Sequence, residues 1–252
     1  MDRARVKVLC VLAALTLAPS SAVAGQPGAL CAAAKKPVQA EPLMAAAVAA
    51  TFGKTLFKAT GEDCVYPIKV LHYAAADVLV VQAGEPGEAC HGCGAPLSAY
   101  VLRRFDDGCR LVRAFRKFAT LGTSGAVEDI SAVKIGDDDG MAVTSGGTFQ
   151  GYTSTVLDFF VFRAGELAGL NGTPIIIAAD DSGAVVNPGK ATEVTAKWSF
   201  DPADKTALAI DYTIRTPGAS RVERVMWRLE GTSLVLSHGR VPPEVSEASG
   251  GG

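Results

Sequence analysis

Apolar and polar residues alternate along most of the chain after residue 64, and this two-residue period is typical of strands with one face on a core. The alternation is clearest near the C-terminus, where Val194, Ala196, Trp198 and Phe200 are separated by single polar residues. The strand-like segments, each bounded by turn-forming residues, are 65–73, 77–83, 98–105, 110–118, 130–135, 141–144, 155–163, 174–178, 194–200, 208–214, 221–229 and 234–236. The pattern predicts an all-β, mainly antiparallel fold, as a meandering β-sandwich or barrel.

One of these segments is apolar on both of its alternating sets. Within 155–163, one set is Leu157, Phe159 and Val161, and the other is Val156, Phe160 and Phe162. A strand with two apolar faces has to be covered on both sides. We therefore expect 155–163 to be a central strand between two layers.

Turn-forming residues indicate how the strands connect. Asp106-Asp107-Gly108 is a strong hairpin signal between two segments. Residues 137–140 predict another hairpin turn, because no Glu follows where a calcium-binding loop needs one. Val222 is out of phase with the later apolar residues of its segment, which predicts a bulge near Glu223 and Arg224.

The N-terminal part of the chain has a different pattern. Apolar residues within 43–58 have helical spacing and predict one N-terminal helix. Residues 25–42 contain three prolines and no periodicity, so we expect a flexible lead-in. The polar, glycine-terminated segment 242–252 predicts a disordered tail. Residues 43–241 are then a single β-rich domain that includes the helix.

Residues 1–24 have the three parts of a secretory signal peptide. Arg3, Arg5 and Lys7 precede an apolar run over 8–18, and Ala22-Val23-Ala24 gives the small-residue cleavage site. The apolar run is too short to span a membrane, which takes roughly 20 residues. We expect a mature chain that begins near residue 25 and is periplasmic or extracellular, and the Ala-, Gly- and Val-rich composition is typical of bacterial exported proteins.

Charge and hydropathy narrow the range of partners. The formal net charge is −2, and removal of residues 1–24 makes it −4, so nucleic acid and anionic lipid are not expected partners. The densest basic group alternates with apolar residues, as on the wet face of a sheet: Arg103, Arg104, Arg110, Arg113, Arg116 and Lys117. No later apolar run reaches membrane-spanning length, so no membrane span is expected in the mature chain.

Export to an oxidising compartment predicts disulfides among the cysteines after residue 24. If the strands of 65–118 form an up-and-down meander, Cys64, Cys90 and Cys93 share one end of the sheet. Cys109 lies at the other end, one strand of roughly 25 Å away, whereas bridged Cα atoms are at most about 7 Å apart. We therefore predict the pairs Cys31–Cys64 and Cys90–Cys93, with Cys109 left as a free thiol.

The motif Cys90-His91-Gly92-Cys93 is the sharpest local signal for chemistry. Cysteines two residues apart can form a small disulfide ring that exchanges with other thiols. An apolar strand before the pair and Pro96 after it make the motif resemble a thioredoxin-like active site in outline. That family also has a long helix starting at the motif, whereas residues 97–105 alternate like a strand.

Metal binding is a further alternative for this motif. Cys90, His91 and Cys93 could supply ligands, with Cys109 or Cys64 as a fourth, although the second Cys-x-x-Cys of a zinc ribbon is missing.

The chain has no motif for nucleophilic catalysis or for binding a nucleotide. The three histidines lie in no Ser/His/Asp arrangement, and no phosphate-binding glycine loop joins a strand to a helix. The leading hypothesis is therefore an exported, non-catalytic β-rich protein that binds an unknown ligand or envelope partner, or has a structural role, with no cofactor. The alternatives are extracytoplasmic thiol–disulfide exchange by Cys90 and Cys93, and the Cys/His metal site.

Overall fold

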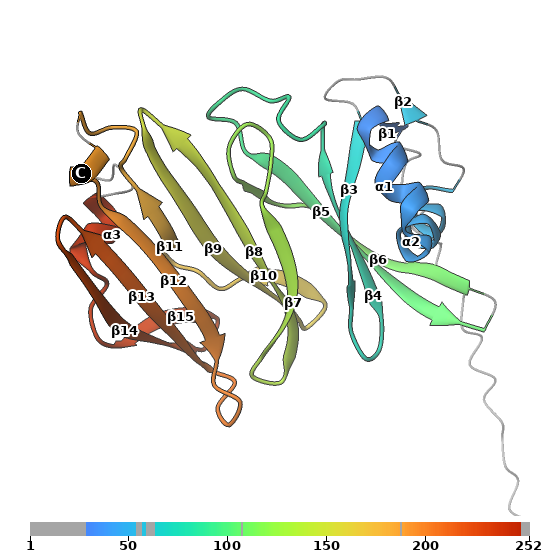
Figure 1. Cartoon of the computed structure of the whole chain (residues 1–252). Coiled ribbons are helices and arrows are strands. Elements are labelled where there is room, and N and C mark those ends of the chain that lie inside the picture. The colour runs from blue at the N-terminus through green and yellow to red at the C-terminus, as the bar shows by residue number, and fades with distance from the viewer. Residues whose placement is uncertain (1–28, 54–56, 59–63, 107, 187, 248–252) are drawn as a thin grey trace, which may run out of the picture.

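The structure is a computed structural model that describes residues 29–53, 57–58, 64–106, 108–186 and 188–247 (Figure 1). The first sheet has the order β2-β1-β3-β4-β5-β6. Its strands are β1 (Ala29–Cys31), β2 (Phe57–Lys58), β3 (Cys64–His72), β4 (Asp77–Ala83), β5 (Ala95–Phe105) and β6 (Gly108–Leu121). From β3 to β6 it is an antiparallel meander, while β1 pairs in parallel with β2 and β3.

The second sheet has the order β15-β14-β13-β12-β11-β9-β8-β7, and β10 also pairs with β9. Its strands are β7 (Asp129–Ile135), β8 (Asp138–Phe149), β9 (Tyr152–Arg163), β10 (Glu166–Gly169), β11 (Ile175–Asp180), β12 (Glu193–Phe200), β13 (Ala207–Thr216), β14 (Ala219–Glu230) and β15 (Ser233–His238). All these pairings are antiparallel.

The few helical segments are short. They are η1 (Ala32–Ala34), α1 (Lys35–Ala40), α2 (Pro42–Phe52), η2 (Pro188–Lys190) and α3 (Pro243–Glu247). None of the helices in the described part of the chain is long and apolar enough to cross a membrane.

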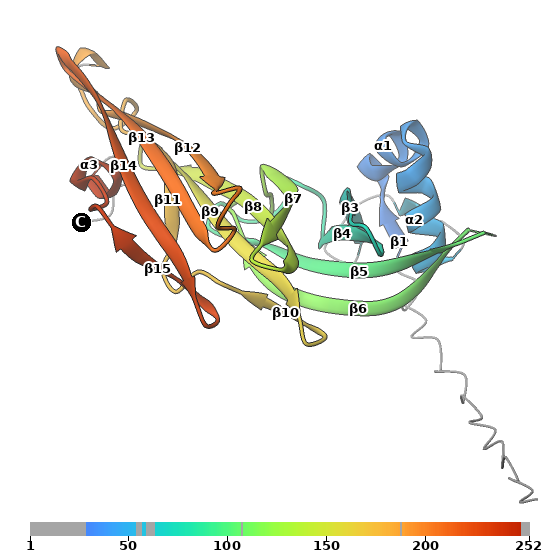
Figure 2. The ribbon, with the colours of Figure 1, turned by 90° about the horizontal axis from the view of Figure 1, so that it is seen from below.

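Two apolar cores lie between the layers and a third lies on the far side of the second sheet, because successive side chains of a strand point to opposite faces. On β4, Leu79 and Val81 pack towards α1 and α2, whereas Val78 and Val80 pack towards the second sheet. The second sheet then has its own core on the far side, around Phe159. Figures 1 and 2 show the resulting order from one side to the other: helices, first sheet, second sheet.

The second sheet curls so that its last strand meets the connection between β10 and β11. The Leu234 N–H of β15 donates to the Leu170 carbonyl at 2.8 Å. Beside it, the Asn171 amide bonds to the β9 backbone, accepting from Phe159 N–H at 3.0 Å and donating to the Leu157 carbonyl at 2.7 Å. The Asn171 side chain thus substitutes for a neighbouring strand where β10 has ended and β11 has not begun.

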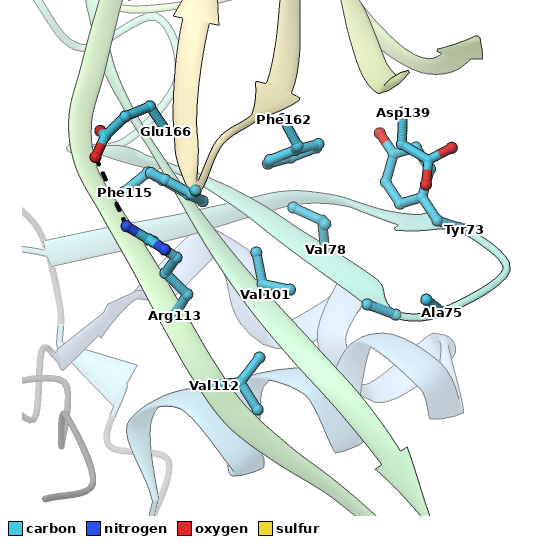
Figure 3. Close-up of a pocket in the computed structure, with 12 residues that line it drawn as sticks. Tyr73, Ala75, Val78, Val101, Val112, Arg113, Phe115, Asp139, Phe162 and Glu166 are labelled. Atoms are coloured by element: carbon cyan, nitrogen blue, oxygen red, sulfur yellow. Dashed lines mark ion pairs between the residues drawn. The ribbon is translucent and has the colours of Figure 1, made fainter. Parts of the chain in front are cut away.

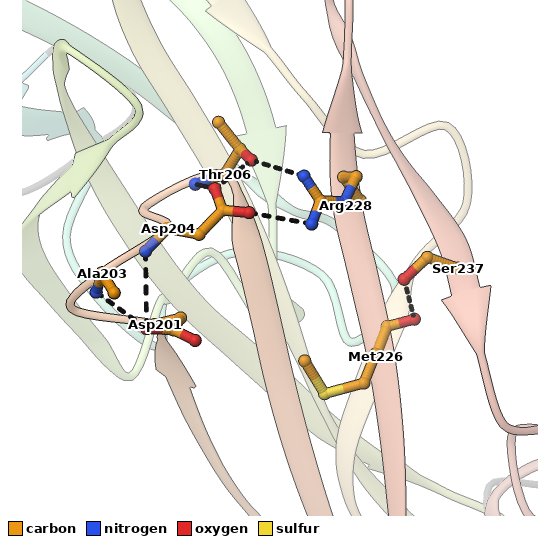
Figure 4. A network of polar contacts seen from close by, with 7 residues as sticks. All are labelled: Asp201, Ala203, Asp204, Thr206, Met226, Arg228 and Ser237. Atoms are coloured by element: carbon orange, nitrogen blue, oxygen red, sulfur yellow. Dashed lines mark hydrogen bonds and ion pairs between the residues drawn. The ribbon is translucent and has the colours of Figure 1, made fainter.

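The turn between β12 and β13 is held by side chains that bond their own backbone (Figure 4). Asp201 accepts from Ala203 N–H at 2.7 Å, and Asp204 accepts from Thr206 N–H at 3.1 Å. Arg228 of β14 then forms an ion pair of 2.8 Å with Asp204. These contacts fix the turn to the neighbouring strand without any apolar side chain.

The all-β, mainly antiparallel prediction is confirmed, and the sheet packing fits a β-sandwich. The two-sided cover of 155–163 is also confirmed: in β9, Phe159 belongs to the far core and Phe160 to the core between the sheets.

Four local predictions differ from the structure, one of them only in its extent. The lead-in 25–42 was expected to be flexible, but from Ala29 on it forms β1, η1 and α1. The N-terminal helix predicted over 43–58 is present as α2, but it ends at Phe52, where Gly53 has a φ of 73°, and residues 57–58 are strand β2. The tail expected to be disordered over 242–252 includes α3, with Val245 buried; residues 248–252 lie outside the described part.

The fourth difference is the bulge, which was wrongly predicted near Glu223 and Arg224. The pairing of β13 with β14 is continuous through both residues. The register shift lies instead between Met226 and Trp227, on the side facing β15. Val222 is out of phase because it is 67% exposed and takes no part in the core.

Candidate functional site

A hollow with apolar walls lies where the two sheets meet, and we call it the junction pocket (Figure 3). Its volume is about 320 Å³, near the lower end of the range for small-molecule sites. Its lining residues are Tyr73, Ala75, Ala76, Val78, Val101, Val112, Arg113, Phe115, Asp139, Phe162, Gly165 and Glu166. They come from the β3–β4 hairpin, β5, β6, the start of β8 and the β9–β10 hairpin.

The apolar walls come from both sheets. Val78 and Val101 belong to the first sheet, and Phe162 reaches the pocket from the second. Phe115 and Phe162 meet with ring centroids 5.8 Å apart, and Tyr73 lies edge-on to Phe162 at the same separation. Packed rings of this kind hold a hollow open, since each ring is fixed by its neighbour.

A bulge in β6 brings two adjacent side chains to the pocket. Leu111 pairs with Leu102 and Arg113 pairs with Val101, so Val112 is an extra residue without a partner on β5. In a regular strand, Val112 and Arg113 would point to opposite faces. The bulge allows both to line the pocket, as bulges beside binding sites often do.

Arg113 is the one cationic group among the lining residues, and its position is restrained. Its guanidinium carbon lies 5.3 Å from the centroid of the Phe115 ring. A Cβ added at Gly165 would lie 2.6 Å from the Arg113 guanidinium, so a side chain at residue 165 would displace it. The ion pair with Glu166 is long, at 3.7 Å, and 79% of the Glu166 side chain is exposed. Such a pair is weak and can exchange for another anion.

The other end of the pocket has Tyr73 and Asp139, as Figure 3 shows. The Tyr73 hydroxyl donates to the Gly140 carbonyl at 2.7 Å, and burial raises the pKa of this phenol, with a smaller contribution from the charge of Asp139. Asp139 pairs with Lys134 at 3.0 Å. Both groups already have partners, which leaves Arg113 as the group best placed for an anionic ligand.

The Cys90-His91-Gly92-Cys93 motif lies in the connection between β4 and β5, which we call the Cys90–Cys93 loop. The structure has disulfides at the two expected pairs, Cys90–Cys93 and Cys31–Cys64. Cys90 and Cys93 are exposed, whereas Cys31 and Cys64 are 0% and 1% exposed. Cys109 is a free, half-buried cysteine at the other end of the meander.

Backbone hydrogen bonds fix the Cys90–Cys93 loop to the connection between β6 and β7. Gly125 N–H donates to the Cys93 carbonyl at 2.7 Å, and Ser124 N–H donates to the His91 carbonyl at 3.2 Å. Residues from Ala95 on form strand β5 and not a helix. The loop therefore lacks the helix N-terminus that lowers a thiol pKa in thioredoxin-like sites.

The structure gives no support to the metal alternative. No group of three or more His, Cys, Asp or Glu side chains placed to hold a metal ion occurs among the described residues. Cys90 and Cys93 are joined to each other, and a disulfide has no thiolate to offer a metal. Cys64 is bonded to Cys31, so it is not available as a fourth ligand.

The junction pocket was not predicted from the sequence. Arg113 was assigned to the wet face of a sheet, and its side chain is indeed half exposed, but it also lines the pocket. The sequence feature that could have indicated the pocket lies in β6, where two apolar residues, Leu111 and Val112, stand side by side before Arg113 and break the alternation. No protein-family model matches the chain, and no curated protein matches it.

Proposed function

We propose that the protein is an exported, non-catalytic binding protein of the bacterial envelope, and that the junction pocket takes a small apolar molecule with an anionic head. The observation that carries the proposal is the pocket itself: apolar walls from two sheets and one restrained guanidinium at its rim. Export is supported by the signal-like pattern of residues 1–24 and by the two disulfides.

The charges at the pocket favour an acid over a neutral or cationic ligand. Arg113 can exchange its weak contact with Glu166 for a ligand carboxylate, to which a guanidinium forms two parallel hydrogen bonds. A short acyl chain would then extend along Val101 and Phe162, where burial contributes about 0.8 kcal/mol per CH₂ group.

Octanoate and uncharged octanol are suitable probes, measured by calorimetry or by displacement of a fluorescent naphthalene sulfonate. We expect Arg113→Gln to weaken octanoate binding by about tenfold, the value of one charge-assisted hydrogen bond, and to leave octanol binding unchanged. Val112→Phe should reduce binding of both by filling the mouth. Arg116→Gln is the matched control, because Arg116 lies on the same strand but does not line the pocket. Absence of octanoate binding, or equal binding by all variants, would contradict the proposal.

Thiol–disulfide exchange at Cys90–Cys93 is the second candidate function, and the exposure of both cysteines favours it. A partner dithiol supplies the electrons: its thiolate attacks one sulfur, the Cys90–Cys93 bond breaks, and the released thiolate takes up a proton. The partner's second thiolate then attacks the mixed disulfide. The partner is oxidised by two electrons, and Cys90 and Cys93 are reduced.

The two disulfides of one molecule provide the test of exchange. The protein is equilibrated in glutathione buffers of known potential, alkylated, and analysed by mass spectrometry. We expect Cys90–Cys93 to be reduced at a potential above about −300 mV, while the buried Cys31–Cys64 stays oxidised. A potential below that value for Cys90–Cys93 would identify it as a structural bridge.

A further inference from the structure

A second hollow lies beside the Cys90–Cys93 loop, and its lining differs in kind from that of the junction pocket. It has a volume of about 340 Å³, and we call it the hydroxyl pocket. Its lining residues are His91, Gly92, Gly122, Thr123, Ser145, Gly146, Gly147, Thr148, Phe149, Tyr152, Ser154 and Val156. They include five hydroxyl groups and two aromatic rings besides the imidazole, and no Asp, Glu, Lys or Arg.

The floor of this pocket consists of cross-strand pairs between β8 and β9. Ser145 lies opposite Val156, Gly147 opposite Ser154, and Phe149 opposite Tyr152. Because the pairs are two residues apart, all three lie on one face of the sheet. A Cβ at Gly147 would lie 2.0 Å from the Thr123 hydroxyl oxygen, so the absence of a side chain there lets Thr123 approach the floor.

Phe149 is the most unusual member of the set, because it is a large apolar side chain that is 66% exposed. The turn that follows it is closely packed. Gln150 and Gly151 form the hairpin turn with φ values of 51° and 86°. The turn lies so close to Gly183 that a Cβ at Gly151 would be 2.3 Å from its backbone. Phe149 therefore adds an exposed aromatic surface to the lining of the pocket.

His91 adds a wall of the pocket from the Cys90–Cys93 loop. Its ring lies 6.5 Å from that of Phe149, with 26° between the ring planes. Its Nε2 lies 2.6 Å from the Thr148 carbonyl oxygen, which can only accept, so Nε2 carries the proton. In the neutral ring, Nδ1 is then an acceptor for a ligand hydroxyl. The Cys90–Cys93 bond closes the loop around His91 and keeps this wall in position.

We propose that the hydroxyl pocket binds one unit of a neutral carbohydrate. A lining without charged side chains offers no counterion to a phosphate, a carboxylate or an amine, and a nucleic acid would need cations for its backbone. The Thr123 hydroxyl donates to the Gly146 carbonyl at 2.8 Å and can accept from a ligand, while a hydroxyl such as that of Ser154 can both donate and accept, which matches the hydroxyls of a sugar. The Phe149 ring provides the apolar surface on which the C–H face of a sugar ring stacks.

The test uses saturation-transfer NMR with the methyl glycosides of glucose, galactose, mannose and N-acetylglucosamine, followed by calorimetry on those that bind. We expect at least one neutral glycoside to bind, with an affinity that salt does not change. Phe149→Ala should weaken it by about tenfold, comparable to the loss of one stacked ring.

Phe105→Ala is the matched control, because Phe105 is also an exposed phenylalanine at a strand end but lies in neither pocket. It should bind like the unmodified protein. Both variants remove an exposed ring, so circular dichroism should show an unchanged fold. The proposal is overturned if no glycoside binds, or if Phe149→Ala and Phe105→Ala bind equally.

Discussion

At the scale of single residues, Asp77 is the least exposed of the ion-paired carboxylates in the described part of the chain. Its side chain is 7% exposed at the start of β4. Arg104 donates to its two oxygens from Nε at 2.8 Å and from Nη2 at 2.7 Å. His72 Nδ1 lies 2.7 Å from Oδ1 and donates to it. Burial alone would raise the pKa of Asp77, but the hydrogen bonds from Arg104 and His72 outweigh it, so the pKa is lowered.

This lowered pKa predicts a loss of stability in acid. A carboxyl whose pKa is lower in the folded state stabilises the fold fully above its unfolded pKa, near 3.9, and loses that contribution as the pH falls towards the folded value. We expect Asp77→Asn to lower the free energy of unfolding at neutral pH by about 2 kcal/mol, the value of a hydrogen bond to a charged group. The variant should also flatten the decline below pH 4 in urea denaturation.

Asp129→Asn is the control for Asp77→Asn, because Asp129 pairs with Lys69 but 58% of its side chain is exposed. Exposed pairs contribute at most about 1 kcal/mol. Equal losses for the two variants would show that burial of Asp77 does not decide its contribution.

At the scale of elements, strands were predictable where one side chain in two faces a core. The segment 77–83 coincides with β4, and the others differ from the observed strands mainly at their ends. Residues 29–40 were not predictable in this way. β1 has only three residues and is held by parallel pairing to β3 and by burial of Leu30, both of which depend on distant parts of the chain. Such contacts cannot be predicted from the local sequence pattern.

The candidate sites were less predictable than the strands, for a related reason. The junction pocket needs the β3–β4 hairpin, β6 and the β9–β10 hairpin to converge, and these lie far apart in sequence. Its shape also depends on the bulge at Val112, and a bulge moves every following side chain to the other face. The disulfide pairing was easier to predict, because the strand direction alone places Cys109 away from Cys90 and Cys93.

At the scale of the whole molecule, the layers depend on one another through shared strands. β4 and β5 supply side chains both to the core under α2 and to the core between the sheets. β8 and β9 likewise contribute to the core between the sheets and to the far core. The N-terminal segment has no such shared strand. It is held to the first sheet by the pairing of β1, by the packing of α2 and by the Cys31–Cys64 disulfide.

This arrangement predicts that the Cys31–Cys64 disulfide stabilises the fold more than the Cys90–Cys93 disulfide or the free Cys109 does. The bond spans 33 residues, for which the chain-entropy model gives about 4 kcal/mol. For a domain of this size that corresponds to a Tm lower by roughly 10 °C in Cys31→Ser, measured by calorimetry. Cys109→Ser is the control: Cys109 is half-buried and bonded to no other cysteine, so its loss removes packing but no constraint on the unfolded chain. If the two variants melt at the same temperature, the disulfide is not needed to hold the helices to the sheet, and the pairing of β1 and the packing of α2 are sufficient.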